Sequence, residues 1–367
     1  MKILHICTDK NIGGAGRWIE NLLQALDNTQ FTSSVLLPKG AALTPQLKKL
    51  GVSVTEIAMR ETSFDKKAIA ALRREILRQN PDIVHTHGSF SGRIAAKLAG
   101  KKIVITRHWA NLPQDSGRAK KNPLAGALNN YLSDKWIATA KLAADNLLQS
   151  GISARKVVSI PNGVLALEKK SPDWMNAKRR ALATNGFVFG ILARLEEVKG
   201  HKYLLDAAKI LHDKDLDFTV LIAGSGSLEK SLKSQTKAQG LDNRVKFLGF
   251  YEDPAEFLNL LDVQINASYT ETTCLAILEG FSLGIPAIAS TGGGNPQLIK
   301  PTENGLLFTV GNAAELAAHM QEIMEQKTLY ETLSQGAATC FMENYTAQVF
   351  AQKIGEVYKE VLSHGAH

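Results

Sequence analysis

The sequence is poor in cysteine, and it has no apolar run near the roughly 20 residues that a bilayer-spanning helix needs. Its three cysteines, Cys7, Cys274 and Cys340, are far apart among 367 residues and follow no metal-ligand spacing. Such a set argues against a disulfide framework and favours a reducing compartment. The apolar run after Met1 is broken at His5, too early for a signal-peptide core. We therefore expect a cytoplasmic protein.

The remaining composition is that of an ordinary globular protein. Hydrophobic residues make up 44% and charged residues 21%. A length of 367 residues exceeds a typical single core and suits two domains of α/β size.

Charge is distributed unevenly between the two halves. Residues 1–165 hold 24 Lys+Arg against 11 Asp+Glu, whereas residues 166–367 hold 19 against 24. The basic first half suggests an anionic partner such as lipid headgroups or a phosphorylated acceptor, with generic solubility as the alternative. Nucleic acid is not expected as a partner, because the basic residues are not interleaved with aromatics and no known motif is present.

The chain alternates short apolar strands with helices, which is typical of parallel α/β sheets. In the first half the pattern predicts a strand at Lys2–Cys7 and a helix at Arg17–Leu26. It lapses into a polar connector over 165–185 and restarts with a strand at Phe187–Leu192. We therefore predict one domain over 1–165 and a second over 166–346.

One predicted helix, Asp65–Gln79, carries five basic residues around an Ile/Leu/Ala stripe. A basic amphipathic helix can lie on an anionic membrane surface. We favour the alternative, in which the stripe packs on the sheet and the basic face is solvated.

Histidines lie within or just past two predicted strands. His85 and His87 stand at i and i+2, on one face of a strand, but no nearby acid or cysteine completes a metal site. His108 lies just past the strand Lys102–Thr106, at the carboxyl end where open parallel sheets bind their ligands.

Two glycine-containing motifs and one acidic motif are weak by themselves. Gly13-Gly14 lies between the first strand and helix, where backbone can approach a ligand closely, but it lacks the dinucleotide spacing. Gly224-x-Gly226 is half of a nucleotide fingerprint without its third glycine. The D-x-D at 213–215 precedes a strand, which is the wrong end of the sheet for a ligand, and we interpret it as a solvated turn.

The stretch 268–284 places two carboxylates, Glu271 and Glu279, eight positions apart. If a strand ends near Ala267 and a helix begins near Cys274, Glu271 lies at the helix mouth and Glu279 just over a turn inside. Free N–H groups and the helix dipole at such a start can bind phosphate. The spacing alone fits equally well with a solvated loop glutamate followed by an ordinary helix glutamate.

Several motifs together resemble a known family. In chain order they are the Gly13-Gly14 loop, His108 after a strand, Ile160-Pro161-Asn162-Gly163-Val164, Arg194 with Lys199-Gly200, Glu271-x7-Glu279 and Gly284-x-Pro286. Their order resembles that of the retaining GT-B glycosyltransferases of family 4, over essentially the whole chain. The resemblance implies two Rossmann-like, doubly wound domains facing a cleft. It also implies a C-terminal helix, within 347–367, that crosses back to the first domain.

The resemblance also implies roles for individual residues. Arg194 and Lys199 match the pair that neutralises the leaving diphosphate, Glu271 the carboxylate that grips the donor sugar, and Glu279 the ribose ligand. The residues expected to be catalytic are His108, Arg194, Lys199 and Glu271. Those expected to bind the donor are Gly14, Arg194, Lys199, Gly224, Tyr251, Glu271, Thr273, Cys274, Leu275 and Glu279. Those expected to bind the acceptor are Gly13, Gly14, Arg17, His87 and His108.

The sequence also departs from the family pattern. Thr272, Thr273 and Cys274 follow Glu271, where the family often has glycine and an aromatic, so the identity of the sugar stays open. Gln297 stands where a glutamate is common, and Leu165 where an aspartate is common.

We therefore predict a retaining, metal-independent glycosyltransferase that uses a nucleotide-diphosphate sugar, expected to be UDP-linked, with no cofactor. The basic first half favours an anionic or membrane-borne acceptor, such as a lipid-linked or lipopolysaccharide-type saccharide, and peripheral contact with the inner face of the cell membrane. The alternatives are a nucleotide-sugar epimerase on the same fold and a non-catalytic nucleotide-sugar-binding protein.

Overall fold

The structure is a computed structural model that describes residues 1–59, 64–109, 123–251 and 253–363. The chain divides into two compact units. The first unit contains Met1–Gly163 and the segment that begins at Ala347, and the second contains Val164–Thr346. The last four residues of the predicted return segment, 364–367, lie outside the described residues.

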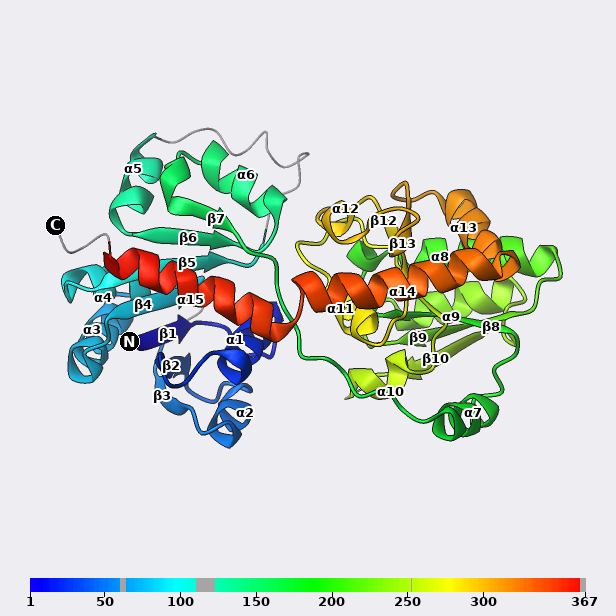
Figure 1. Ribbon diagram of the computed structural model, residues 1–367, viewed down its shortest axis with the longest axis horizontal. Coiled ribbons are helices and arrows are strands. Elements are labelled where there is room, and N and C mark those ends of the chain that lie inside the picture. The colour runs from blue at the N-terminus through cyan, green and yellow to red at the C-terminus, as the bar shows by residue number, and fades with distance from the viewer. Residues whose placement is uncertain (60–63, 110–122, 252, 364–367) are drawn as a thin grey trace. The chain divides into compact units, whose positions relative to one another are not determined.

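The first unit is built on a seven-stranded parallel sheet with strand order β3-β2-β1-β4-β5-β6-β7 (Figure 1). Its strands are β1 (Lys2–Cys7), β2 (Thr32–Pro38), β3 (Ser53–Ile57), β4 (Ile83–His87), β5 (Lys102–Arg107), β6 (Lys135–Ala138) and β7 (Val157–Ser159). Its helices are α1 (Gly14–Ala25), α2 (Thr44–Lys49), α3 (Lys66–Gln79), α4 (Phe90–Leu98), α5 (Pro123–Tyr131), α6 (Lys141–Gln149) and α15 (Ala347–Ser363). The strand order reverses between β1 and β4, so the topological switch point lies there.

Alternate residues of these strands point to the two faces of the sheet, and each face has its own core. Leu4 and Ile6 of β1 pack with α3, α4 and α6 on one face. Ile3 packs on the other face with α1 and with α15, which the chain supplies only after completing the second unit. Because both faces are covered, the strands are nearly continuous apolar runs. The predicted C-terminal helix that crosses back is thereby confirmed (Figure 1).

The second unit repeats this plan with six parallel strands in the order β10-β9-β8-β11-β12-β13. Its strands are β8 (Phe187–Leu192), β9 (Phe218–Ala223), β10 (Val245–Gly249), β11 (Val263–Asn266), β12 (Ala287–Ser290) and β13 (Gly305–Phe308). Its helices are α7 (Pro172–Ala181), α8 (His201–Asp213), α9 (Glu229–Ala238), α10 (Pro254–Leu258), α11 (Leu275–Ser282), α12 (Asn295–Leu298), α13 (Ala313–Glu325) and α14 (Lys327–Asn344). The order reverses between β8 and β11. Two doubly wound parallel domains therefore confirm the predicted fold class.

The helix after the first strand begins earlier than predicted. We expected it at Arg17, but α1 begins at Gly14 with Gly13 as its N-cap residue. A glycine loop predicts a turn, yet Gly14 and Gly16 lie inside the helix, where a Cβ on Gly16 would make ordinary contact with the Leu43 side chain at 3.6 Å. The backbone N–H of Arg17 donates to the carbonyl of the N-cap residue Gly13 at 3.1 Å.

The basic helix α3 packs by its apolar stripe. Asp65 caps its first turn by accepting from the backbone N–H groups of Lys67 and Ala68. Ala68, Leu72 and Ile76 are buried, while its five basic residues are exposed. This is the packing that we favoured from the sequence. No helix of the described residues is long and apolar enough to cross a membrane.

Candidate active site

The loops that follow β8 and β11 are joined at the switch point of the second unit. The backbone N–H of Tyr269 donates to the carbonyl of Val198 at 2.9 Å. Gly200 adopts φ +67°, and a side chain there would place Cβ 2.1 Å from the carbonyl oxygen of Ala267. The glycine of the Lys199-Gly200 motif is therefore required by the approach of the two loops.

This junction brings Lys199 and Glu271 together as an ion pair. The two side chains are 17% and 16% exposed. The same oxygen of Glu271 also accepts a hydrogen bond of 3.2 Å from Ser268. Lys199 and Glu271 are 72 residues apart in sequence, and the fold makes them a partly buried pair that opens to solvent.

A glycine loop after β12 packs against the backbone of Glu271. The N–H of Gly294 donates to the Glu271 carbonyl at 2.8 Å. Gly293 adopts φ +62°, and a Cβ there would lie 2.1 Å from that same carbonyl oxygen. A Cβ on Gly292 would lie 2.5 Å from the carbonyl oxygen of Tyr269. These glycines let one backbone lie against another, and the position of Glu271 depends on that contact.

Helix α11 begins where the sequence indicated, with Cys274 as its N-cap residue and Leu275 as its first residue. Glu279 lies one turn inside and is buried. Cys274 is buried too, and the amide of Asn266 contacts its sulfur at 2.9 Å. Burial raises the pKa of this thiol to about 12, with the Glu271 charge as the second cause, so it is a neutral side chain rather than a nucleophile. Thr273 is buried beside it.

Arg194 follows β8 directly and is exposed. Hydrogen bonds from Ser227 lower the pKa of the neighbouring Glu196, and the charge of Arg194 adds to that effect. Its loop is held by Gly224, which has φ +141° and whose Cβ would lie 2.0 Å from the carbonyl oxygen of Ala193. The half fingerprint Gly224-x-Gly226 is thus explained by backbone packing against the Arg194 loop.

Tyr251 lies away from the strand ends of β8 and β11, although it is in the same unit. It follows β10, which is separated from β8 by β9, and its ring packs on Phe257 at 5.7 Å between centroids. Burial raises the pKa of its hydroxyl.

In the first unit the predicted residues also gather at the carboxyl ends of strands. Gly13 and Gly14 follow β1, and Gly13 is so close to Asp9 that a Cβ would lie 2.8 Å from its carboxylate oxygen. Arg17 lies in the first turn of α1, and its N–H donates to the Gly13 carbonyl. His87 ends β4 and His108 follows β5. All five are at one edge, around the switch point between β1 and β4.

Beneath this edge lies a cluster of four histidines. His5 and His85 are register partners on the neighbouring strands β1 and β4. Nδ1 of His5 lies 3.3 Å from Nε2 of His87, and Nδ1 of His87 lies 3.0 Å from Nε2 of His108. His85 contacts the hydroxyls of Tyr358 at 2.7 Å and Thr106 at 2.7 Å.

The histidine cluster is neutral. Burial lowers the pKa values of His5 and His108 to about 3 and those of His85 and His87 well below the usual range. The ring nitrogens of His5, His85 and His87 lie within 4.8 Å of one another, close enough in principle for a metal ion. However, both nitrogens of His85 and of His87 already have hydrogen-bonding partners. The i, i+2 pattern of His85 and His87 does not include the third imidazole, because His5 comes from the neighbouring strand.

Sequence reasoning also missed the groups that surround these residues. Trp18 packs on the rings of His85, His87 and His108, and Tyr358 arrives from the last helix. Ser268, the hydroxyl partner of Glu271, was inside the stretch that we singled out but was not assigned a role. The alternation of β1 could have revealed His5, since it shares a face with Ile3 and Cys7.

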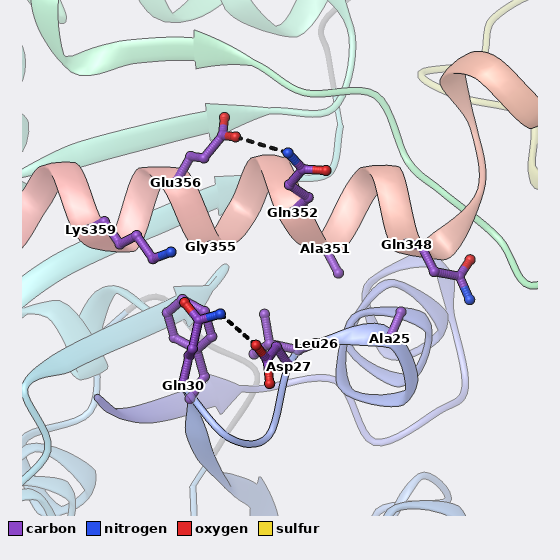
Figure 2. Close-up of a pocket in the computed structure, with 11 residues that line it drawn as sticks. Ala25, Leu26, Asp27, Gln30, Gln348, Ala351, Gln352, Gly355, Glu356 and Lys359 are labelled. Atoms are coloured by element: carbon purple, nitrogen blue, oxygen red, sulfur yellow. Dashed lines mark hydrogen bonds between the residues drawn. The ribbon is translucent and has the colours of Figure 1, made fainter.

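A pocket of about 300 Å³ lies elsewhere in the first unit, between the end of α1 and α15 (Figure 2). Two pairs of its polar side chains are hydrogen-bonded, Gln352 with Glu356 and Gln30 with Asp27. It includes Ala25 and Phe31, which lie at the amino ends of the strands, away from the edge with the predicted site residues. We therefore assign it no part in the site.

Comparison with known proteins agrees with this geometry. Residues 12–165 match the family described as Glycosyltransferase Family 4, and residues 173–339 match Glycosyl transferases group 1. The Escherichia coli UDP-Gal:alpha-D-GlcNAc-diphosphoundecaprenol alpha-1,3-galactosyltransferase is 28% identical over 99% of this chain and 97% of that protein. Anabaena Alr3699/HepE, solved with UDP, superposes with a TM-score of 0.87 at 24% identity, over 98% of this chain and 100% of that one.

Two doubly wound domains, each with polar groups at its switch point, define a GT-B protein. The chain belongs to the group 1 and family 4 glycosyltransferases, and it is an enzyme that transfers sugars. The lipopolysaccharide outer core galactosyltransferase WaaB shares the fold, with a TM-score of 0.74 at 19% identity, over 98% of this chain and 100% of that one.

Proposed function

We propose that the enzyme transfers a sugar, with retention and without a bound metal, from a UDP-linked donor to an anionic or membrane-borne saccharide acceptor. The part of this proposal that concerns the donor rests on the Lys199–Glu271 pair beside the start of α11. Arg194 lies in the same loop as Lys199, after β8. A departing diphosphate needs cations and N–H donors, and this corner supplies both. The named E. coli relative acts on UDP-Gal, which favours the same nucleotide here.

In the proposed reaction the bond between the sugar's anomeric carbon and the diphosphate oxygen breaks, and the acceptor oxygen bonds to that carbon on the same face. The acceptor proton passes to the departing phosphate oxygen, so no protein base is needed. Glu271 holds sugar hydroxyls, Glu279 the ribose, and Arg194 and Lys199 the developing negative charge. The cations thereby replace the metal that a diphosphate otherwise binds.

A thermal-shift screen of nucleotide sugars tests the donor half. A ligand present at 100 times its Kd stabilises the native state by about 2.7 kcal/mol, so a UDP-sugar should raise the melting temperature measurably. The proposal fails if no nucleotide sugar shifts it. Turnover unchanged in excess EDTA supports metal independence, and conversion of the donor without acceptor would instead favour an epimerase.

The part of the proposal that concerns the acceptor rests on the first unit. Residues 1–165 carry a net charge of +13, and α3 exposes its basic face near exposed apolar side chains such as Leu77 and Leu98. Each Lys or Arg near an anionic membrane surface contributes about 1 kcal/mol. The E. coli relative is named for a diphosphoundecaprenol-linked acceptor, which supports a lipid-linked one here.

Co-sedimentation with vesicles tests this half. We expect binding to phosphatidylglycerol vesicles at low salt, loss of binding at high salt, and none to phosphatidylcholine vesicles. The double variant R73E/R74E should bind less, because it reverses two exposed charges of α3. No binding to anionic vesicles at low salt would contradict the membrane part while leaving the donor half intact.

A further inference from the structure

A continuous hydrogen-bonded series of three imidazoles runs from the core of the first unit to His108. It begins at His5, which is fully buried, passes through His87 and ends at His108, which is half-buried. The two links join Nδ1 of one ring to Nε2 of the next, at 3.3 Å and 3.0 Å. In each link the inner ring therefore offers its Nδ1 and the outer ring its Nε2.

Each link requires one donor and one acceptor. A neutral imidazole carries a proton on one nitrogen and a lone pair on the other. Burial keeps all three rings neutral, because it lowers the pKa values of His5 and His108 to about 3 and that of His87 well below its usual range. The series can then run in only two directions, with every ring protonated on Nδ1 or every ring protonated on Nε2.

The inner end of the series decides between the two directions. Nε2 of His5 is buried and has no hydrogen-bonding partner among the residues that the structure describes. If the rings were protonated on Nε2, this nitrogen would be a buried N–H without an acceptor, which is rare in native proteins. Protonation on Nδ1 leaves only a lone pair there. This direction makes His5 donate to His87 and His87 donate to His108.

The surroundings hold His87 in the required orientation. It is 3% exposed, and Trp18 packs on its ring at 4.9 Å between centroids. His85 stacks on it at 4.5 Å, and its own nitrogens contact Tyr358 and Thr106 instead of competing for the series. His87 therefore reaches the site only through His108.

From this geometry we infer that His87 is a positioning residue, which donates from Nδ1 to Nε2 of His108 and so keeps the ring proton of His108 on Nδ1. His108 then acts as a neutral hydrogen-bond donor through Nδ1 and not as a base. The link to catalysis rests on the proposed function and on the expectation that His108 is one of its catalytic residues. The tautomer itself does not depend on that function.

Two substitutions of His87 separate positioning from packing. H87F keeps a planar ring but removes both nitrogens. H87N keeps an N–H donor on Cγ, the atom that carries Nδ1 in histidine, and so can still donate to His108. For an outer partner of a functional histidine, a loss of about 10- to 100-fold is typical. We therefore expect H87F to lower kcat by that factor, and H87N to recover most of it, with the donor KM changed less in both.

The direct readout is the tautomer of each histidine, from long-range proton–nitrogen NMR spectra of the full-length protein labelled with nitrogen-15 histidine. We expect His108 to be protonated on Nδ1 in the wild type and in H87N, and to lose that fixed state in H87F. This measurement needs no substrate, so it stands if the proposed donor is wrong. Melting temperatures close to the wild-type value show that the variants fold.

Three results would overturn the inference. The first is a wild-type His108 protonated on Nε2. The second is equal impairment of H87F and H87N, which would indicate that His87 only packs. The third is a change of the His5, His85 and His87 nitrogen signals on addition of Zn²⁺, because the lone pairs would then belong to a metal site.

Discussion

At the scale of single residues, Glu271 is defined by what surrounds it. Its carboxylate pairs with the Lys199 ammonium and accepts a hydrogen bond from the Ser268 hydroxyl. Its backbone carbonyl accepts a hydrogen bond from the Gly294 N–H. The side chain is therefore held in one orientation with part of its surface open to solvent. This is the preorganisation that a donor-sugar ligand requires.

Glu271→Ala should abolish transfer, with a loss in kcat/KM of about 100-fold or more, the size typical for one preorganised polar group in an active site. The control is Glu303→Ala, which removes an exposed glutamate whose partner, Lys300, is exposed too. Sugar transfer is measured with the donor that the thermal-shift screen identifies. Turnover of the Glu271 variant equal to that of the control would refute our site assignment.

Because several histidines are buried, we expect the protein to lose stability in acid. The folded pKa is about 3 for His5 and about 4 for His201, against about 6.5 when unfolded. Below pH 6.5 the unfolded chain therefore binds protons that the native state does not, so stability falls as pH decreases, until the folded pKa is reached. Each such group contributes up to about 1.4 kcal/mol per pH unit.

Urea unfolding at pH 7.5 and pH 5.0 measures this effect. His201→Leu should make the free energy of unfolding less dependent on pH by about one proton. It should also remove two buried ring nitrogens that have no hydrogen-bonding partner in the described part of the chain. A pH dependence that is the same in the variant would contradict the lowered pKa of His201.

At the scale of elements, glycines fix how the loops of the second unit meet. Gly293 and Gly40 both have positive φ, at +62° and +72°. They differ in their surroundings. A Cβ on Gly293 would clash with the Glu271 backbone, whereas one on Gly40 would have no described atom within 4 Å. Comparing alanine substitutions at the two positions therefore separates the energetic cost of a left-handed alanine from the cost of displacing a neighbouring loop.

Gly40→Ala should cost about 1–2 kcal/mol of stability, the penalty for a left-handed alanine, and leave turnover unchanged. Gly293→Ala should cost more and also lower turnover, because the Glu271 backbone must move. Calorimetry and kinetics on both variants check this. Equal effects of the two substitutions on turnover would show that Glu271 does not depend on this loop.

At the scale of the whole molecule, the first unit is completed by the last helix. Phe350 of α15 is 1% exposed and packs edge-on against Trp18, with ring centroids 5.0 Å apart. Tyr358 of the same helix contacts His85. The first unit thus needs chain from both ends of the sequence for its core and for the cluster beneath its switch point.

Phe350→Ala should lower the unfolding free energy of the first unit by about 3–5 kcal/mol, as expected for a buried aromatic. The matched control is Met342→Ala in α14, where the side chain is 64% exposed and the change should be within about 0.5 kcal/mol. Chemical denaturation followed by tryptophan fluorescence measures both. Equal destabilisation would mean that α15 does not belong to this core.

The order of strands and helices, the two domains and the start of α11 followed from the sequence alone, because apolar periodicity and helix signals are local. The Lys199-Gly200 and Glu271-x7-Glu279 motifs were visible for the same reason. Which groups these residues contact was not visible. Lys199 meets Glu271, and His5 meets His87, only because parallel strands bring distant segments to one sheet edge. Only the tertiary structure decided which residues Glu271 and His108 contact, since pairing between distant strands leaves no local pattern.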